Sequence, residues 1–368
     1  MNPYVPELLP PANIDYGQLV GLIGQANAAL ARYDGLLQGI VNPGVLLSPL
    51  TTQEAVLSSK IEGTQATLDE VLEHEAGQAM SPEKTQDIRE IANYRSALYF
   101  AADALTHRPV SLALVKQMHA LLMDSVRGAD KQPGQFRNEQ NWIGRPGCRM
   151  EEATFVPPSP LRLQDHLEDW ERYAGLADKD ALAQTAVLHA QFEMIHPFKD
   201  GNGRIGRLLI PLFLTQQGLL GQPMFYLSGY LEAHRDEYYH RLGAISREGD
   251  WSNWVAFFLR AVIEQAHENA AKVREILALY DAMKARVVEI THSQYAIAAL
   301  DAIFDRPIFL TTDFVARAGI PTRATALHLL RQLQQAGILT VLQEGSGRRP
   351  ARLCFPDLIN LAEGRQVV

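Results

Sequence analysis

The amino-acid sequence predicts a mainly α-helical protein that ends in a winged helix-turn-helix. Apolar residues recur at helical spacing through most of the chain, most regularly in the stripe Ile205, Leu208, Leu209, Leu212 and Phe213. β-Prone pieces fall in only two places, a Gly- and Pro-rich stretch at 128–160 and the tail at 291–368. The tail reads as helix, turn, helix, strand, turn and strand, which is the order of a winged helix.

The expected elements follow from this periodicity and from capping residues. Pro211 should kink or shorten the helix that contains it. We expect a β-hairpin near Trp142–Arg149 and Ala153–Val156. We expect helices at Tyr16–Leu37, Thr52–Ile61, 86–105, 111–124 (opened by Ser111), Leu161–Tyr173, Asp180–Ile195, from Gly203–Arg204 onward, 231–248 and 251–289.

Composition excludes several classes of protein. The chain has 368 residues, 47% apolar and 21% charged, with a net charge of −8, which argues against bulk binding to nucleic acid or an anionic membrane. No segment approaches the roughly 18 apolar residues of a membrane span, and the start has no secretory pattern. Two cysteines without a CxxC pair argue against a disulfide framework or a Cys-based zinc site, so we expect a cytoplasmic location.

Three regions are expected, with the last boundary near residue 290: an N-terminal helical region at 1–110, a core at 111–290 and the winged-helix tail at 291–368. The tail holds eight arginines, no lysine and six acidic residues, a net charge of +2, and the remainder carries −10. A DNA-binding regulator is therefore one alternative, with contacts from Arg323, His328, Arg331 and the wing pair Arg348–Arg349. A packing or homodimer module is the other interpretation of the tail.

The densest chemistry lies at 196–207, in the sequence HPFKDGNGRIGR between two expected helices. Pro197 should end the first helix at His196. Gly201 and Gly203 allow the backbone to turn successive N–H groups toward one point at the start of the second helix, which makes an anion cradle.

The residue types around this cradle suit attack of a hydroxyl on a nucleotide phosphate. Arg204 and Arg207 are three residues apart, so both guanidinium groups can reach one anion. Asp200 is a carboxylate of the kind that holds Mg²⁺ beside phosphates. His196 can take a proton near neutral pH. The pattern Gly201-x-Gly203-x-x-Gly206 also matches the dinucleotide fingerprint, but it follows a helix and not a strand, so we reject that interpretation.

The stretch resembles the Fic family motif HxFx[D/E]GNGRxxR, and every fixed position matches. The resemblance implies a helical Fic core that transfers AMP from ATP to a Tyr, Thr or Ser hydroxyl of a target protein. His196 would be the general base and Asp200 the Mg²⁺ ligand, with Phe198 as a packing anchor. ATP and its phosphates would be bound by Gly201, Asn202, Gly203, Arg204, Ile205, Gly206 and Arg207. Phosphorylating relatives carry Lys at the position of Gly203.

The resemblance also assigns the target and adenine contacts. The hairpin at 142–156 resembles the Fic flap, which pairs with the backbone of the target. Tyr238 and Tyr239 fall where relatives place a tyrosine against adenine, although Tyr238 also shares a core stripe with Leu242 and Ile245. Some relatives carry an Asn near the adenine where this chain has Ser246.

A second motif, Ser58-x-x-x-Glu62-Gly63, matches the inhibitory pattern [S/T]xxxE[G/N] of the family's second class. Ser58 and Glu62 share a helix face. In relatives this Glu pairs with the second motif arginine, here Arg207, and ATP then binds unproductively. In some relatives it also supports removal of AMP. The target, self-modification, homodimer formation and transfer of another phosphate-linked group stay open at this stage.

Overall fold

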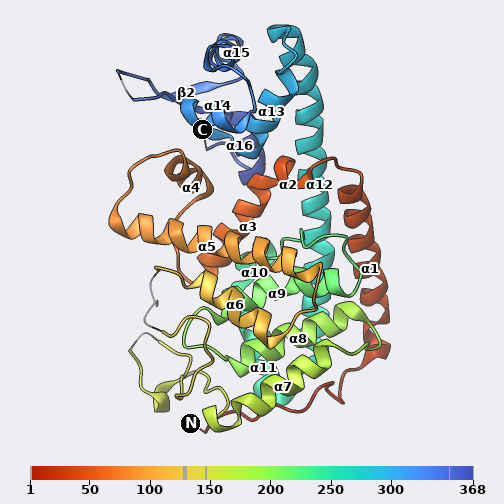
Figure 1. Cartoon of the computed structure of the whole chain (residues 1–368). Coiled ribbons are helices and arrows are strands. Elements are labelled where there is room, and N and C mark those ends of the chain that lie inside the picture. The colour runs from red at the N-terminus through yellow and green to blue at the C-terminus, as the bar shows by residue number, and fades with distance from the viewer. Residues whose placement is uncertain (1, 127–130, 146, 348, 368) are drawn as a thin grey trace. The chain divides into compact units, whose positions relative to one another are not determined.

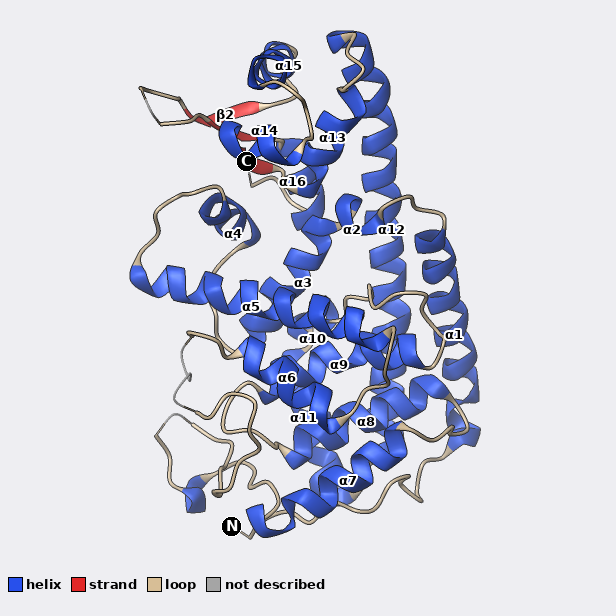
Figure 2. Cartoon of the chain, viewed as in Figure 1, coloured by secondary structure: helices blue, strands red, loops and turns tan. Residues whose placement is uncertain are grey.

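The structure, a computed structural model, describes residues 2–126, 131–145, 147–347 and 349–367. Helices make up most of this chain, and the strands of the described ranges lie in the C-terminal region (Figures 1 and 2). The predicted mainly α class is therefore confirmed. No helix within the described ranges is both long enough and apolar enough to cross a lipid bilayer.

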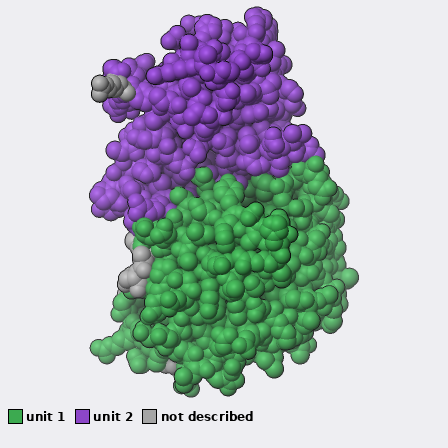
Figure 3. All heavy atoms as spheres, viewed as in Figure 1, with its two compact units in different colours: residues 1–38, 57–63, 92–267 green, residues 39–56, 64–91, 268–368 purple. Residues whose placement is uncertain are grey.

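The chain forms two compact units that alternate along the sequence (Figure 3). Unit 1 comprises residues 1–38, 57–63 and 92–267, and unit 2 comprises residues 39–56, 64–91 and 268–368. The first 110 residues contribute to both units, so the three-part division expected above stays a prediction about the chain and does not coincide with these units.

Unit 1 is built around α8 and α9, which pack against each other. Both helices are buried on almost every face, which is the pattern of central helices and not of amphipathic surface helices. The elements of unit 1 are α1 (Tyr16–Gln38), the end of α3 (Ser48–Ile61), the later part of α5 (Pro82–Leu105), α6 (Leu112–Leu122), η1 (Met150–Glu152), η2 (Pro160–Arg162), α7 (Leu163–Ala174), α8 (Ala181–Ile195), α9 (Asn202–Gln216), α10 (Ser228–Ala233), α11 (Arg235–Glu248) and the first part of α12 (Trp251–Thr291).

Most predicted helices are present, and three details differ from the prediction. The second helix begins at Ser48, so Thr52 lies inside α3, where its hydroxyl donates to the Ser48 carbonyl at 3.1 Å. Pro211 does not shorten α9, which continues to Gln216. The stretch 231–248 is two helices, because the chain leaves helical geometry at His234, between α10 and α11.

The region expected to form a β-hairpin contains only one β-bridge among its described residues, between Ile143 and Phe155. The Ile143 N–H donates to the Phe155 carbonyl at 2.8 Å, and the Phe155 N–H donates back at 3.1 Å. The 3₁₀ helix η1 lies between the bridged residues, so two regular strands do not form. Pro146, part of the predicted flap, lies outside the described residues. On the far side of the bridge, the Tyr4 N–H donates to the Val156 carbonyl at 2.8 Å.

Unit 2 contains the predicted tail together with earlier segments of the chain. Its sheet has the antiparallel order β1-β3-β2, with one strand more than the sequence predicted. Buried Arg352 of β3 donates to the Ala76 carbonyl at 3.1 Å, and α4 packs on β1, so the tail shares its core with residues before position 92. The elements completing unit 2 are α2 (Pro43–Leu46), α4 (Leu68–Glu75), α13 (Ala296–Asp305), β1 (Ile308–Leu310), α14 (Thr311–Arg317), α15 (Arg323–Gln335), β2 (Thr340–Gln343), β3 (Arg352–Cys354) and α16 (Pro356–Glu363).

Candidate active site

The segment 196–201 forms a tight loop between the two central helices of unit 1. α8 ends at Ile195, and His196 follows in the left-handed conformation with φ 50° and ψ 60°. Gly201, at φ 75°, then occupies the position before α9. The helix therefore ends before Pro197, as the sequence predicted, and α9 begins at Asn202, one residue earlier than expected.

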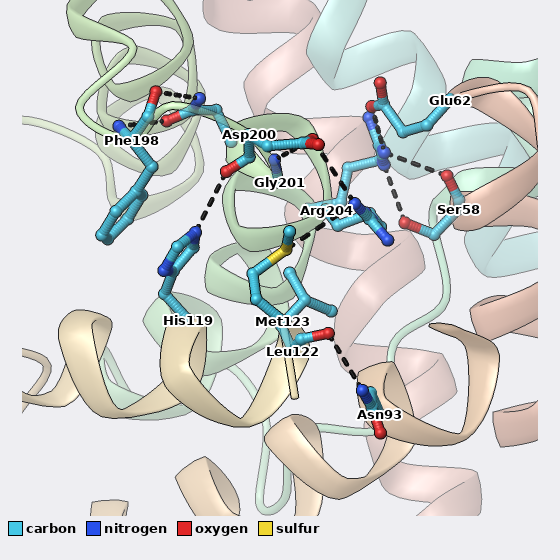
Figure 4. Close-up of polar contacts among 12 residues, drawn as sticks. Ser58, Glu62, Asn93, His119, Leu122, Met123, Phe198, Asp200, Gly201 and Arg204 are labelled. Atoms are coloured by element: carbon cyan, nitrogen blue, oxygen red, sulfur yellow. Dashed lines mark hydrogen bonds and ion pairs between the residues drawn. The ribbon is translucent and has the colours of Figure 1, made fainter. Parts of the chain in front are cut away.

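Hydrogen bonds inside the loop fix its shape (Figure 4). The Asn202 amide bonds both backbone groups of Phe198: it accepts from the N–H at 2.8 Å and donates to the carbonyl at 2.9 Å. The buried Phe198 ring stacks on His119 with centroids 3.7 Å apart. The predicted packing role of Phe198 thus has a specific partner from α6.

His119 holds the loop through a fixed tautomer. The Gly134 N–H donates to Nδ1 at 2.8 Å, so the ring proton is on Nε2, which donates to the Asp200 carbonyl at 3.0 Å (Figure 4). Burial lowers the pKa of His119 to about 4, so the ring is neutral at physiological pH. The sequence analysis did not identify this residue.

The first turn of α9 is the segment that the sequence predicts to bind an anion. The first i→i−4 hydrogen bond of this helix is donated by Ile205 to the Gly201 carbonyl at 3.1 Å, so the N–H groups of residues 202–204 precede the helical ladder. Ile205 is fully buried, and the Gly206 carbonyl accepts from His189 Nδ1 at 3.0 Å. Ile205 and Gly206 therefore face the core, and their assignment as phosphate contacts does not fit this geometry.

The inhibitory motif lies directly on the cradle. Arg207 Nε donates to Ser58 Oγ at 2.8 Å, and its Nη2 donates to the Ser58 carbonyl at 2.9 Å and to Glu62 Oε1 at 2.6 Å. Ser58 lies in α3 and Glu62 directly follows its last residue, Ile61, and in Figure 4 both side chains point toward the group that they bond. Gly63 follows at φ 99°, a conformation that suits glycine. We call Ser58, Glu62 and Arg207 the latch.

Gly203 makes room for the latch carboxylate. A Cβ atom at position 203 would lie 2.2 Å from Glu62 Oε1 and 3.0 Å from Arg207 Nη1. The carboxylate therefore lies against the backbone of the first turn of α9, where a phosphate oxygen would bind. Burial alone would raise the pKa of Glu62, but the Arg207 guanidinium outweighs it, so the net shift is downward and Glu62 is ionised. Burial of Arg207, which is 2% exposed, would lower its pKa, but Glu62 and the other acidic groups around it outweigh burial, so the net shift is upward.

His196 has the geometry of a neutral base. Its Nδ1 lies 3.3 Å from the Glu193 carbonyl, which can only accept, so the proton is on Nδ1 and Nε2 carries the lone pair. Burial lowers the pKa of His196 to about 4, the Arg137 guanidinium acts in the same direction, and the Glu62 and Asp200 carboxylates act against it. The imidazole can therefore accept a proton throughout the neutral range.

Asp200 combines a fixed backbone with an accessible carboxylate. Its Oδ1 accepts from the Gly201 N–H at 2.6 Å and lies 3.6 Å from Arg204 Nη2. The Asp200 side chain is 46% exposed, whereas that of Arg204 is 5% exposed. No cluster of three or more His, Cys, Asp or Glu side chains suited to a metal occurs within the described ranges. A cation here would therefore be held by this carboxylate together with phosphate oxygens, a donor set that suits Mg²⁺.

The two tyrosines assigned to adenine have different environments. Tyr238 is 1% exposed, and its hydroxyl lies 3.0 Å from His189 Nε2. His189 donates from Nδ1 to the Gly206 carbonyl, so Nε2 accepts the Tyr238 hydroxyl proton. Tyr239 is 45% exposed and can stack on a base. Ser246 Oγ donates to the Gly243 carbonyl of its own helix at 2.9 Å. Tyr238 is thus a core residue, and only Tyr239 of this pair suits a ligand.

Two charged residues beside the site were missed by the sequence analysis. The Glu193 carboxylate packs against the backbone of α9, since a Cβ atom on Gly206 would lie 2.2 Å from Glu193 Oε1. Burial raises the pKa of Glu193 to about 7. Arg137 is 3% exposed and donates to the His196 carbonyl at 2.9 Å. Neither residue belongs to a recognisable motif, and a glutamate or arginine in isolation is most often a surface residue.

Comparisons with known proteins place the chain in a family. Its fold resembles the crystal structure of a Fic family protein from Desulfovibrio desulfuricans, with a TM-score of 0.57 and 22% identity over 96% of this chain and 98% of that chain. It also resembles Fic-1 from Caenorhabditis elegans, with a TM-score of 0.53 and 19% identity over 70% of this chain and 74% of that chain. The Fic/DOC family N-terminal model matches residues 20–103, and the Fic/DOC family model matches residues 109–214. The chain belongs to the Fic/DOC family.

Curated relatives carry the name protein adenylyltransferase. One from Aquifex aeolicus is 28% identical over 195 residues, 52% of this chain and 56% of the relative. Fic-1 from Caenorhabditis elegans is 26% identical over 150 residues, 39% of this chain and 27% of the relative. One from Aedes aegypti is 32% identical over 127 residues, 34% of this chain and 22% of the relative. The aligned part thus spans about half or less of the length of these relatives.

Proposed function

We propose that the chain is a protein adenylyltransferase that transfers AMP from ATP to a Tyr, Thr or Ser hydroxyl of a target protein. The observation that carries the proposal is the position of Glu62 Oε1, which lies on the first turn of α9 and 2.6 Å from Arg207 Nη2. A carboxylate oxygen there stands in for a phosphate oxygen, and it lies in the same loop system as a neutral histidine.

In the proposed reaction, Nε2 of His196 takes the proton of the target hydroxyl, and the oxygen attacks the α-phosphorus of ATP. The new P–O bond forms as the bond to pyrophosphate breaks, and pyrophosphate leaves. The N–H groups of residues 202–204, with Arg204 and Arg207, hold the phosphates. Asp200 would hold Mg²⁺, which when bound supplies charge neutralisation at the phosphates. Tyr239 would lie against the adenine.

The target would dock on the segment 142–156, which we call the flap. Trp142 and Ile143 are 43% and 40% exposed, so apolar side chains stand beside backbone groups that a target strand could pair with. Pairing of a target strand with the flap would recognise the target largely through backbone hydrogen bonds. We further propose that the latch inhibits transfer, because Arg207 cannot contact the γ-phosphate of ATP while it is bonded to Glu62.

Mass spectrometry with labelled nucleotide tests the proposal. The Glu62→Gly chain is incubated with Mg²⁺ and with ATP labelled at either the α- or the γ-phosphate, using the chain itself and a mixture of cell proteins as acceptors. We expect transfer of the α-label with the mass increase of one AMP, and no transfer by His196→Ala in the same background. Transfer of the γ-label alone would overturn AMP transfer in favour of phosphorylation.

A second candidate function is DNA binding by the tail. α15 presents exposed Arg323 and Arg331 and contains no acidic residue, which favours contact with phosphates. The other described tail arginines, however, bond within unit 2, as Arg317 does with Asp305 and Asp313. Arg348, part of the expected wing contact, lies outside the described residues. A gel-shift assay with DNA, repeated at increasing salt concentration, tests this function. A steep loss of binding with salt supports DNA contact, and no shift at low salt excludes it.

A further inference from the structure

Arg137 is a buried cation whose side-chain hydrogen bonds to described residues all end on backbone carbonyls. Its Nε donates to His196 at 2.9 Å, and its Nη2 donates to Ile195 at 3.3 Å and to Pro158 at 2.6 Å. Its Nη1 donates to Glu139 at 3.2 Å. The side chain therefore connects the end of α8 with the chain that leaves the flap.

The end of a helix is a favourable place for such a charge. The last carbonyls of α8 lack helical partners and carry the negative end of the helix dipole. Arg137 satisfies two of them, and its backbone N–H satisfies the next, the Pro197 carbonyl, at 2.9 Å. Burial lowers the pKa of Arg137 to about 10, so the guanidinium stays charged at neutral pH.

These bonds fix the backbone at the catalytic histidine. His196 is a non-glycine residue at φ 50°, a conformation that L-amino acids adopt at a cost and keep only when the surroundings impose it. Three successive carbonyls, from Ile195 to Pro197, bond to one residue, Arg137, which therefore supplies the restraint from outside the loop.

The same segment also bonds the flap. Gln140 Nε2 donates to the Pro157 carbonyl at 2.9 Å, and Asn141 Nδ2 donates to the Phe198 carbonyl at 3.1 Å. Residues 137–141 thus alternate between bonds to the flap exit and bonds to the catalytic loop. We call Arg137 and its bonded carbonyls the frame.

We propose that Arg137 is a positioning residue, which holds His196 in its productive conformation and ties the base to the segment on which the target docks. This inference rests on the proposed adenylyl transfer. Arg137 does not touch the phosphates in this assignment, so its loss should lower kcat and leave the KM for ATP nearly unchanged.

The charge of Arg137 provides a second readout. The titratable groups that act on His196 are Glu62 of α3, Asp200 of the loop and Arg137, besides the Glu193 carbonyl that accepts from the ring. Of these side chains, only Arg137 disfavours the imidazolium ion. Removing its charge should raise the pKa of His196, and the acidic limb of the rate profile should then move to higher pH.

The test compares Arg137→Met and Arg137→Lys in the Glu62→Gly background. We expect Arg137→Met to lower kcat about 100-fold, as a small misplacement of a base does, to change the ATP KM less than about twofold, and to shift the acidic limb upward. Arg137→Lys keeps the positive charge but loses the planar set of guanidinium donors. We therefore expect kcat to fall while the acidic limb of the rate profile stays at the same pH. Arg162→Met, an exposed arginine paired with Asp165, is the matched control and should match the parent.

Each outcome gives a decision. An unchanged kcat in Arg137→Lys overturns the positioning role, even where Arg137→Met does not fold. If the acidic limb of the rate profile does not move in folded Arg137→Met, and an NMR titration of the His196 ring confirms this, the proposed effect of the Arg137 charge on His196 is overturned. If the Glu62→Gly parent itself transfers no AMP, the proposed function fails, and the ring titration still reports on Arg137.

Discussion

Two buried arginines of the candidate site, Arg207 and Arg137, bond to partners of opposite kinds. Arg207 bonds to Ser58 in α3 and to the side chain of Glu62, which directly follows that helix, at 2.6–2.9 Å. Among the described residues, the Arg137 side chain bonds only to backbone carbonyls, at 2.6–3.3 Å. The latch partners are separated from the loop by about 140 residues of chain, whereas the frame carbonyls include those of the loop residues His196 and Pro197.

This difference explains how a site built on one short loop could combine a rigid backbone with regulation of its arginine. A carboxylate on a separate helix can be replaced by another anion without disturbing the loop, because Arg207 then exchanges one oxygen for another. Backbone carbonyls offer no such exchange, because a freed carbonyl at a buried helix end costs about 1–3 kcal/mol. The following predictions test the contrast, from the largest expected effect to the smallest.

His196→Ala removes the group that both arginines serve. In the Glu62→Gly background we expect AMP transfer to fall about 10³-fold, the usual contribution of a positioned general base. ATP binding, measured by calorimetry, should persist because the cradle is intact. A rate within tenfold of the parent would mean that another group takes the proton.

Glu62→Gly opens the latch and leaves the frame intact. Self-modification with labelled ATP should rise about 10- to 100-fold, the range of a typical coupling between two sites. Glu62→Gln is the matched control, since it keeps the size and the acceptor oxygen but not the charge, and it should give an intermediate rise. An unchanged rate in both variants would remove the inhibitory role of the latch.

Glu193→Gln tests the acid that lies beneath the latch. Because burial raises the pKa of Glu193 from 4.5 to about 7, the folded chain holds a proton that the unfolded chain has lost. Stability should therefore fall as pH rises from about 4.5 to 7 and then level off, by on the order of 3 kcal/mol.

Guanidinium chloride unfolding at pH 5 and pH 8 measures this effect. The difference in unfolding free energy between the two pH values should be smaller in Glu193→Gln than in the parent chain. Equal differences in the two proteins would show that Glu193 ionises normally.

Ser58→Ala weakens the latch without opening it. Arg207 loses one hydroxyl partner at 2.8 Å but keeps the Ser58 carbonyl and Glu62. We expect self-modification to rise several-fold, less than in Glu62→Gly, in line with one hydrogen bond to a charged group. A rise equal to that of Glu62→Gly would place the inhibition in Ser58 and not in the carboxylate.

The sequence predicted those parts of the site that depend on local spacing. Pro197 marked the end of α8, and the glycines at 201 and 203 placed the beginning of α9 to within about one residue, because proline and glycine act on the backbone locally. The i, i+4 spacing of Ser58 and Glu62 placed both on one face of α3, and both do reach Arg207.

The parts that depend on tertiary packing could not be predicted. Arg137 and His119 act on carbonyls about 60 and 80 residues away, and no local pattern encodes such a partner. The irregular backbone of the flap was also not predicted, because its β-prone residues lie on either side of the 3₁₀ helix η1 and are not joined by a tight two-residue turn. Tyr238 and Tyr239 are adjacent in sequence, and only packing against His189 separates the core residue from the exposed one.

The left-handed backbone at His196 costs the chain stability, whereas the proposed chemistry needs an imidazole at this position. Glycine adopts φ near 50° without strain, so the backbone at this position favours glycine over the imidazole that the proposed reaction requires. Selection for thermal stability alone would therefore favour replacement of His196. A library screened only for heat resistance should accumulate inactive proteins altered at this single position, and active proteins are retained only if the screen also demands turnover.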